Sequence, residues 1–171
     1  MRFKKLCFIP FLIILCSASA QRVSNISAND FKLLIGIWQG SLTYLDYSSG
    51  KSYTMSATID IKRIGKTNKF IFSNIYPKEP NANSVDTFII SKDGTAVNDE
   101  RVKSKRKLDD DNLEIITEIS GKDGNDNKPA LIRHTYIFGK VFFSVRKEVQ
   151  FEGQSEWVKR HEYSYTKKPS S

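Results

Sequence analysis

Cysteine is almost absent from this sequence. The two cysteines, Cys7 and Cys16, both precede the segment that we expect to fold. The predicted mature chain therefore has none, which excludes disulfides, a thiolate nucleophile and cysteine-ligated metal. No second long apolar run follows the N-terminus, so we expect no membrane-spanning helix. Without disulfides, the hydrophobic core alone must stabilise the fold.

Recognisable catalytic motifs are also missing. The sequence contains no Gly-x-Ser-x-Gly, His-Glu-x-x-His or glycine-rich phosphate loop. The segment from Asp123 to Asn127 begins like a calcium-binding loop, but Lys128 and Thr135 occupy the places where that loop needs Gly and Glu. We therefore expect neither an enzyme nor a metal site.

The N-terminus has the plan of a secretory signal peptide. Basic residues open the chain, an apolar run covers Phe8 to Leu15, and the small residues Ala18 to Ala20 follow. This order predicts a signal peptide over residues 1–20, cleavage after Ala20, and a periplasmic or extracellular protein. A lipoprotein anchored through Cys16 is the alternative, which the bulky Leu15 before it disfavours.

Positive charge exceeds negative charge, with 27 Lys and Arg against 19 Asp and Glu and a net charge of +8. This excess weakly favours anionic partners, while the predicted export argues against nucleic acid. Arg101, Lys103, Lys105 and Lys107 recur at every second position of one predicted strand. Such a stripe fits a charged edge that blocks strand pairing, or alternatively a surface for anionic glycans or lipid headgroups. The oligomeric state is not predicted.

Alternation of apolar and polar residues is the dominant pattern after the signal. Met55, Ala57, Ile59 and Ile61, for example, alternate with polar residues, which indicates a strand with one buried and one wet face. Short turns separate segments of this kind, and no helix is long enough for a crossover. Strands joined in this way are antiparallel neighbours.

We predict one all-β domain over residues 21–166, with a disordered tail over residues 167–171. Eight to ten antiparallel strands tend to curl and close into a barrel, although a sandwich remains an alternative. Ser27 and Asp30 are placed to cap a short N-terminal helix over Phe31 to Leu34, which Gly36 ends.

The start of the first strand reads Gly36-Ile37-Trp38-Gln39-Gly40. This Gly-x-Trp-x-Gly pattern after a short helix resembles the opening of lipocalin-like proteins of the calycin superfamily, including exported bacterial ones. The resemblance implies a barrel in which Trp38 plugs one end and a basic side chain of the last strand covers its indole. Arg160 is the candidate for that basic side chain, and Gly36 and Trp38 are candidate structural residues.

A small, largely apolar ligand inside the barrel is the leading functional prediction. Barrels of about eight strands hold one small ligand when their inner side chains leave room. We predict His134, Tyr136 and Phe143 as ligand-binding residues, with Tyr76 at the start of a lid loop that ends at Asn83. The predicted inward-facing set is Met55, Ile59, Phe72, Phe88, Ile115, His134, Tyr136, Phe143 and Val145. Its only polar tips, on His134 and Tyr136, would orient the ligand.

Three alternatives stay open at this point. Arg146 and Glu148 share one strand face, so Arg146 is either a ligand-binding residue inside a cavity or a surface charge. The barrel core could be filled, which would make the protein structural or an interaction partner. No cofactor is required, but some barrels with a similar opening hold haem through one histidine, and His134 and His161 are the two available.

Overall fold

The computed structural model describes residues 25–108 and 110–168. The predicted signal peptide and its cleavage site lie outside these described residues. Ten strands and two short 3-10 helices make up the fold. Their bounds are η1 Asp30–Leu34, β1 Gly36–Leu45, β2 Ser52–Arg63, β3 Lys69–Ile75, η2 Pro80–Ala82, β4 Ser84–Ile89, β5 Ala96–Val97, β6 Glu100–Lys107, β7 Leu113–Asp123, β8 Lys128–Phe138, β9 Phe142–Phe151 and β10 Val158–Lys167.

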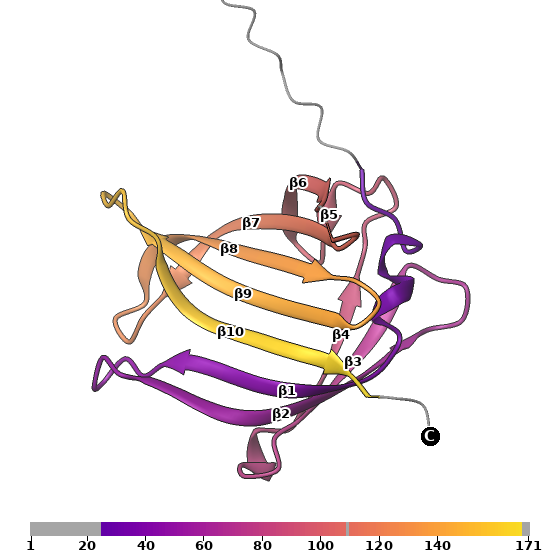
Figure 1. Cartoon of the computed structure of the whole chain (residues 1–171). Helices are drawn as coiled ribbons and strands as arrows, with labels where there is room; N and C mark the ends of the chain where they lie inside the picture. The colour runs from indigo at the N-terminus through magenta and orange to yellow at the C-terminus, as the bar shows by residue number, and fades with distance from the viewer. Residues whose placement is uncertain (1–24, 109, 169–171) are drawn as a thin grey trace, which may run out of the picture.

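All ten strands form one antiparallel sheet that curls into a nearly closed barrel (Figure 1). The first strand pairs with the last, in the order β4-β3-β2-β1-β10-β9-β8-β7-β6-β5. Contact between β4 and β5 completes the ring: Ile90 bridges Val97, and the backbone N–H of Asn98 donates to the carbonyl of Ile89 at 2.6 Å. The prediction of an all-β antiparallel barrel is therefore confirmed at the level of architecture.

The expected N-terminal helix is only a five-residue 3-10 helix, η1. No α-helix occurs within residues 25–108 and 110–168. The Asp30 carboxylate accepts the backbone N–H of Ser27 at 2.7 Å, but the N-cap residue of η1 is Asn29 and it makes no side-chain capping bond, so the expected cap by Ser27 and Asp30 does not form. Gly36, two residues after η1, starts β1 at once and leaves no room for a second turn.

One end of the barrel is filled with aromatic side chains. Phe31 from η1 is fully buried, with its ring centroid 5.1 Å from that of Phe88 and 5.3 Å from that of Phe138. Trp38 is also fully buried, and its indole Nε1–H donates to the Leu34 carbonyl at 2.7 Å. This end, which η1 covers in Figure 1, is called the plug end below.

Arg160 does not contact Trp38, and this pairing is wrong. The β1–β10 register places Lys167 opposite Trp38, with Lys167 Nζ 5.0 Å from the centre of the indole ring. Lys167 Nζ also donates to the Leu33 carbonyl at 3.1 Å. Arg160 is the third residue of the same strand and lies near its other end. At its C-terminal end β10 includes Lys167, the first residue of the segment expected to be a disordered tail. The remainder of that tail, residues 169–171, lies outside the described part.

Gly36 adopts φ = +121°, a backbone conformation that favours glycine. The need for a positive φ where the chain passes from η1 into β1 explains why the Gly-x-Trp-x-Gly motif begins with a glycine. None of the described residues forms a helix long and apolar enough to span a lipid bilayer.

Candidate functional site

The barrel interior beyond the plug end is hollow. A cavity of about 280 Å³ lies there, lined by side chains from seven of the ten strands. Its lining residues are Ile59, Phe72, Asn74, Asp86, Phe88, Glu100, His134, Tyr136, Phe143, Val145, His161, Tyr163 and Tyr165. Asp86 on β4 is exposed, so the cavity reaches solvent on that side.

Most of the predicted ligand-binding residues lie at this cavity. His134, Tyr136 and Phe143 line it directly. Tyr76, at the start of the predicted lid loop, lies at its edge, where its hydroxyl hydrogen-bonds the Tyr163 hydroxyl at 2.7 Å. Of the rest of the predicted inward set, Met55 packs against the core and Ile115 is fully buried in it.

Arg146 does not line the cavity, so its predicted place at the ligand is wrong. Val145 on the same strand faces inward, and the alternation of β9 turns Arg146 to the outer face. There its Nε lies 3.5 Å from Glu148 Oε2. The alternative of a surface charge is the one that the structure supports.

His134 forms a hydrogen bond with Glu100 inside the barrel. His134 Nδ1–H donates to Glu100, with 2.8 Å between Nδ1 and Oε1. The Thr117 hydroxyl donates to the other carboxylate oxygen. Burial raises the pKa of Glu100, but the hydrogen bond and charge of His134 and the bond from Thr117 outweigh it and hold the pKa below its usual value. Glu100 is therefore a carboxylate at neutral pH.

His161 is the second histidine of the cavity and differs from the first. Among the described residues it has no hydrogen-bond partner. Burial, followed by the proximity of His134 and Lys147, lowers the pKa of His161 to about 4, so its imidazole is neutral at neutral pH. His161 also lines a second hollow of about 400 Å³ at the far end of the barrel, together with Tyr44 and Lys147. Its ring thus lies between the two hollows.

Tyrosine rings form much of the remaining cavity wall. The rings of Tyr163 and Tyr165 stack with 5.8 Å between centroids, and Phe143 stacks on Tyr165 at 5.6 Å. Burial raises the pKa of Tyr136, Tyr163 and Tyr165 above the usual range. Their hydroxyls are therefore uncharged at any physiological pH and serve as hydrogen-bonding groups.

An ionic cluster closes the far end of the barrel, and is called the rim cluster below. Asp123 accepts Arg160 Nε at 2.9 Å, Lys147 Nζ at 2.5 Å and the hydroxyl of Tyr47. The guanidinium of Arg160 lies 3.4 Å from the centre of the Tyr47 ring. Burial opposes ionisation of Asp123, but these three donors lower its pKa to about 2. Arg160 is thus structural here, although not at Trp38.

Metal binding has no support in the described part of the chain. Residues 25–108 and 110–168 contain no group of three or more His, Asp or Glu side chains placed to hold a metal ion. Asp123, which opens the calcium-like segment, is committed to the rim cluster.

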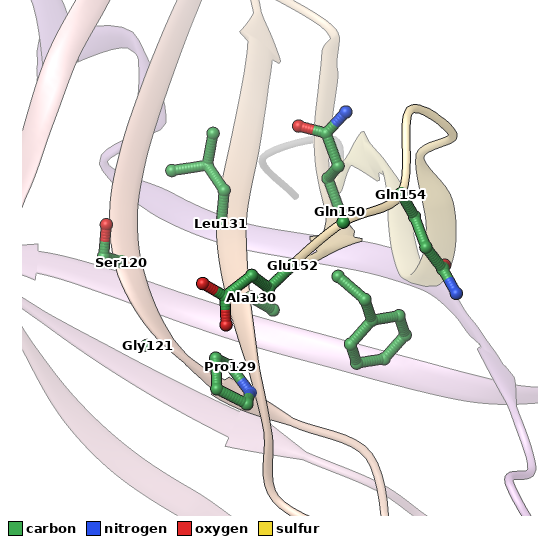
Figure 2. Close-up of a pocket in the computed structure, with 10 residues that line it drawn as sticks. Ser120, Gly121, Pro129, Ala130, Leu131, Gln150, Glu152 and Gln154 are labelled. Atoms are coloured by element: carbon green, nitrogen blue, oxygen red, sulfur yellow. The ribbon is translucent and has the colours of Figure 1, made fainter.

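A separate groove of about 350 Å³ beside the ends of β7, β8 and β9 has Glu152 as its one charged lining residue (Figure 2). It lacks the histidines, the tyrosines and the His134–Glu100 hydrogen bond of the cavity.

Glu100 and Asp86 complete the cavity but were not predicted as site residues, and His161 was considered only as one of two possible haem ligands. Glu100 opens a strand that reads as uniformly polar, so nothing in the sequence separated it from its exposed neighbours. His161 shares a strand face with Tyr163 and Tyr165, a signal that could have placed it inside. Asp86 could be found only from the pairing of β3 with β4, which sets it opposite Phe72.

Comparison with known proteins supports the fold. The crystal structure of Rv2717c from M. tuberculosis is similar, with a TM-score of 0.56 and 10% sequence identity over 85% of this chain and 100% of that chain. At this identity the similarity establishes the architecture alone. No protein-family model matches the sequence, and no curated protein matches it significantly.

Proposed function

We propose that this protein is an exported binding protein that holds one small, largely apolar molecule with a polar group inside its barrel. The observation that carries the proposal is the cavity of about 280 Å³, because it combines aromatic walls with a few convergent polar groups. Pockets of this composition, from about 300 Å³ upward, are typical of small-ligand sites. Burial of apolar surface would supply most of the affinity, and His134, His161 and Glu100 would orient the ligand.

A lipocalin-like, calycin-type relationship fits this proposal. Trp38, the central residue of the Gly-x-Trp-x-Gly opening, is fully buried at the plug end. A basic side chain of the last strand, Lys167, covers its indole ring. The sequential strand order around the barrel is also that of an up-and-down barrel.

The filled-core alternative explains only half of the interior. Aromatic side chains, among them Phe31 and Trp38, are fully buried and pack the plug end. The other half contains a partly buried histidine without a hydrogen-bond partner among the described residues and a partly buried, ionised glutamate, and the desolvation of such groups costs free energy. A ligand that bonds these groups would offset part of that cost.

Two matched variants test where binding occurs. Val145→Trp places a large ring in the cavity, whereas Leu131→Trp places the same ring in the groove of Figure 2. Calorimetric titration with small aromatic compounds should detect binding to the parent and to Leu131→Trp but not to Val145→Trp. Binding that survives Val145→Trp, or that Leu131→Trp alone abolishes, would contradict the proposal.

Haem is a second candidate, favoured by the state of His161. A neutral imidazole without a hydrogen-bond partner is the form that ligates iron, and His161 lies between hollows of about 280 and 400 Å³. His161 would be the axial ligand, since His134 is bonded to Glu100. Addition of haemin should then produce a Soret band that His161→Ala removes and His134→Ala retains. No Soret change in the parent would exclude this candidate and leave the leading one intact.

A further inference from the structure

The charge of the cavity is opposite to that of the protein as a whole. The chain carries a net charge of +8, yet the cavity lining contains two carboxylates, Asp86 and Glu100, and neither lysine nor arginine. Two cations on strands that line the cavity, Lys147 on β9 and Arg160 on β10, are both bonded to Asp123 in the rim cluster. Even with His134 counted as charged, the lining remains negative because His161 is neutral.

Both carboxylates point into the cavity from different strands. Asp86 lies on the same face of β4 as Phe88, and Asn74 Nδ2 donates to its Oδ2 at 3.0 Å. Glu100 faces inward from β6 through its bonds to His134 and Thr117. These bonds leave each carboxyl group with acceptor capacity for a further donor.

Aromatic rings line the same cavity as the two carboxyl groups. Six rings line the cavity, those of Phe72, Phe88, Tyr136, Phe143, Tyr163 and Tyr165. Phe72 and Phe88 stack at 4.9 Å, and Tyr136 meets the edge of Phe88 at 5.7 Å. Aromatic faces attract organic cations through their quadrupoles, and the attraction grows when the cation is desolvated. The tyrosine hydroxyls add neutral hydrogen-bond acceptors.

We propose that the ligand class of this cavity is a small organic amine, bound as its cation between Asp86, Glu100 and the aromatic rings. This inference rests on the proposed function and adds the charge of the ligand to it. The volume of about 280 Å³ restricts the ligand to a molecule of the size of an arylalkylamine. An anionic ligand of the same size would meet two carboxylates and no free cation.

Three probes of equal shape and different charge test the assignment. Calorimetric titrations at pH 7 would compare 2-phenylethylamine, 2-phenylethanol and phenylacetate on the full mature protein. The amine should bind about tenfold tighter than the alcohol, and phenylacetate should bind weakest. Glu100→Gln and Asp86→Asn should each reduce the preference for the amine over the alcohol several-fold, while Asp60→Asn on the outer face of β2 should leave it unchanged.

Each outcome separates the two proposals. Binding of the alcohol as tightly as the amine, or tighter binding of phenylacetate, overturns the amine assignment and leaves a ligand-binding barrel standing. Absence of binding by all three probes removes the proposed function and the amine assignment with it. Denaturant midpoints equal to that of the parent would establish that Glu100→Gln and Asp86→Asn still fold. If both folded variants keep the full preference for the amine, the carboxylates do not recognise the cation and the assignment fails.

Discussion

Among single residues, Trp38 makes the largest contribution to the plug end. Its ring is fully buried, and its indole N–H is bonded to the Leu34 carbonyl. Trp38→Ala should lower the free energy of unfolding by about 3–5 kcal/mol, through lost burial and the cavity left behind. Trp157→Ala is the control, because Trp157 is only partly buried beneath Arg133 and should cost about 1 kcal/mol. Equal denaturant midpoints for the two variants would show that Trp38 is no plug.

His161 gives the stability of the protein a defined pH dependence. Burial lowers its pKa from 6.5 to about 4, so below pH 6.5 the unfolded chain takes up a proton before the folded chain does. Stability from this residue is complete above about pH 6.5 and is lost as the pH falls to about 4, by roughly 3 kcal/mol in total. His161→Gln should reduce the loss between pH 7 and pH 4.5 in urea unfolding. A parent and variant with the same pH slope would contradict this.

At the scale of elements, the rim cluster ties the β1–β2 turn to three strands. Asp123 on β7 bonds Lys147 on β9, Arg160 on β10 and Tyr47 in the turn. Asp123→Ala leaves both cations buried without their partner and should cost about 3–5 kcal/mol. Hydrogen exchange of residues 46–51 should also accelerate.

A nearby acidic residue provides the control for this variant. Asp126 forms an exposed pair with Lys128, so Asp126→Ala should change stability by less than about 1 kcal/mol. Asp123, with a pKa lowered to about 2, gives the free energy of unfolding a second pH dependence. The stability that Asp123 contributes is present above about pH 4 and is lost as the pH falls towards 2. That pH range lies below the one of His161, so the two can be measured separately. Equal effects of the two alanine variants would argue against the cluster as a clamp.

The contact between β1 and β10 depends on Gly40. A Cβ atom at this position would lie 1.9 Å from the Ser164 carbonyl oxygen, a backbone atom that cannot rotate away. Gly40→Ala should therefore push β10 from β1 and destabilise the barrel by about 1–3 kcal/mol. Ser41→Ala, the next residue on the same strand, should have little effect. Unchanged midpoints for Gly40→Ala would mean that the two strands separate at no cost.

At the scale of the whole molecule, the sequence predicted the architecture better than the contacts. Alternation along the strands predicted an antiparallel barrel and the inward direction of His134, Tyr136 and Phe143, because side-chain direction in a strand follows period two. The partner of Trp38 was not predictable in this way. The choice between Arg160 and Lys167 depends on the β1–β10 register, which links residues more than a hundred positions apart.

The polar side of the cavity was missed for a related reason. Glu100, Asp86 and His161 come from three strands that meet only after the barrel closes. Glu100 and Asp86 each read locally as ordinary polar residues of a half-wet strand, and Arg146 reads the same way although it faces outward. The aromatic face of its strand is the one local signal that favours an inward His161. Burial and partners separate these cases, and both arise from tertiary pairing.

A ligand inside the barrel is the central claim, and native mass spectrometry of the protein purified from its own host tests it most directly. The parent protein should carry one additional small mass per chain, released on unfolding and absent from Val145→Trp prepared in the same way. Its fragmentation would identify the chemical class and indicate whether it carries an amine. A parent protein that shows the same single mass as Val145→Trp, with no small molecule released on unfolding, would contradict the claim.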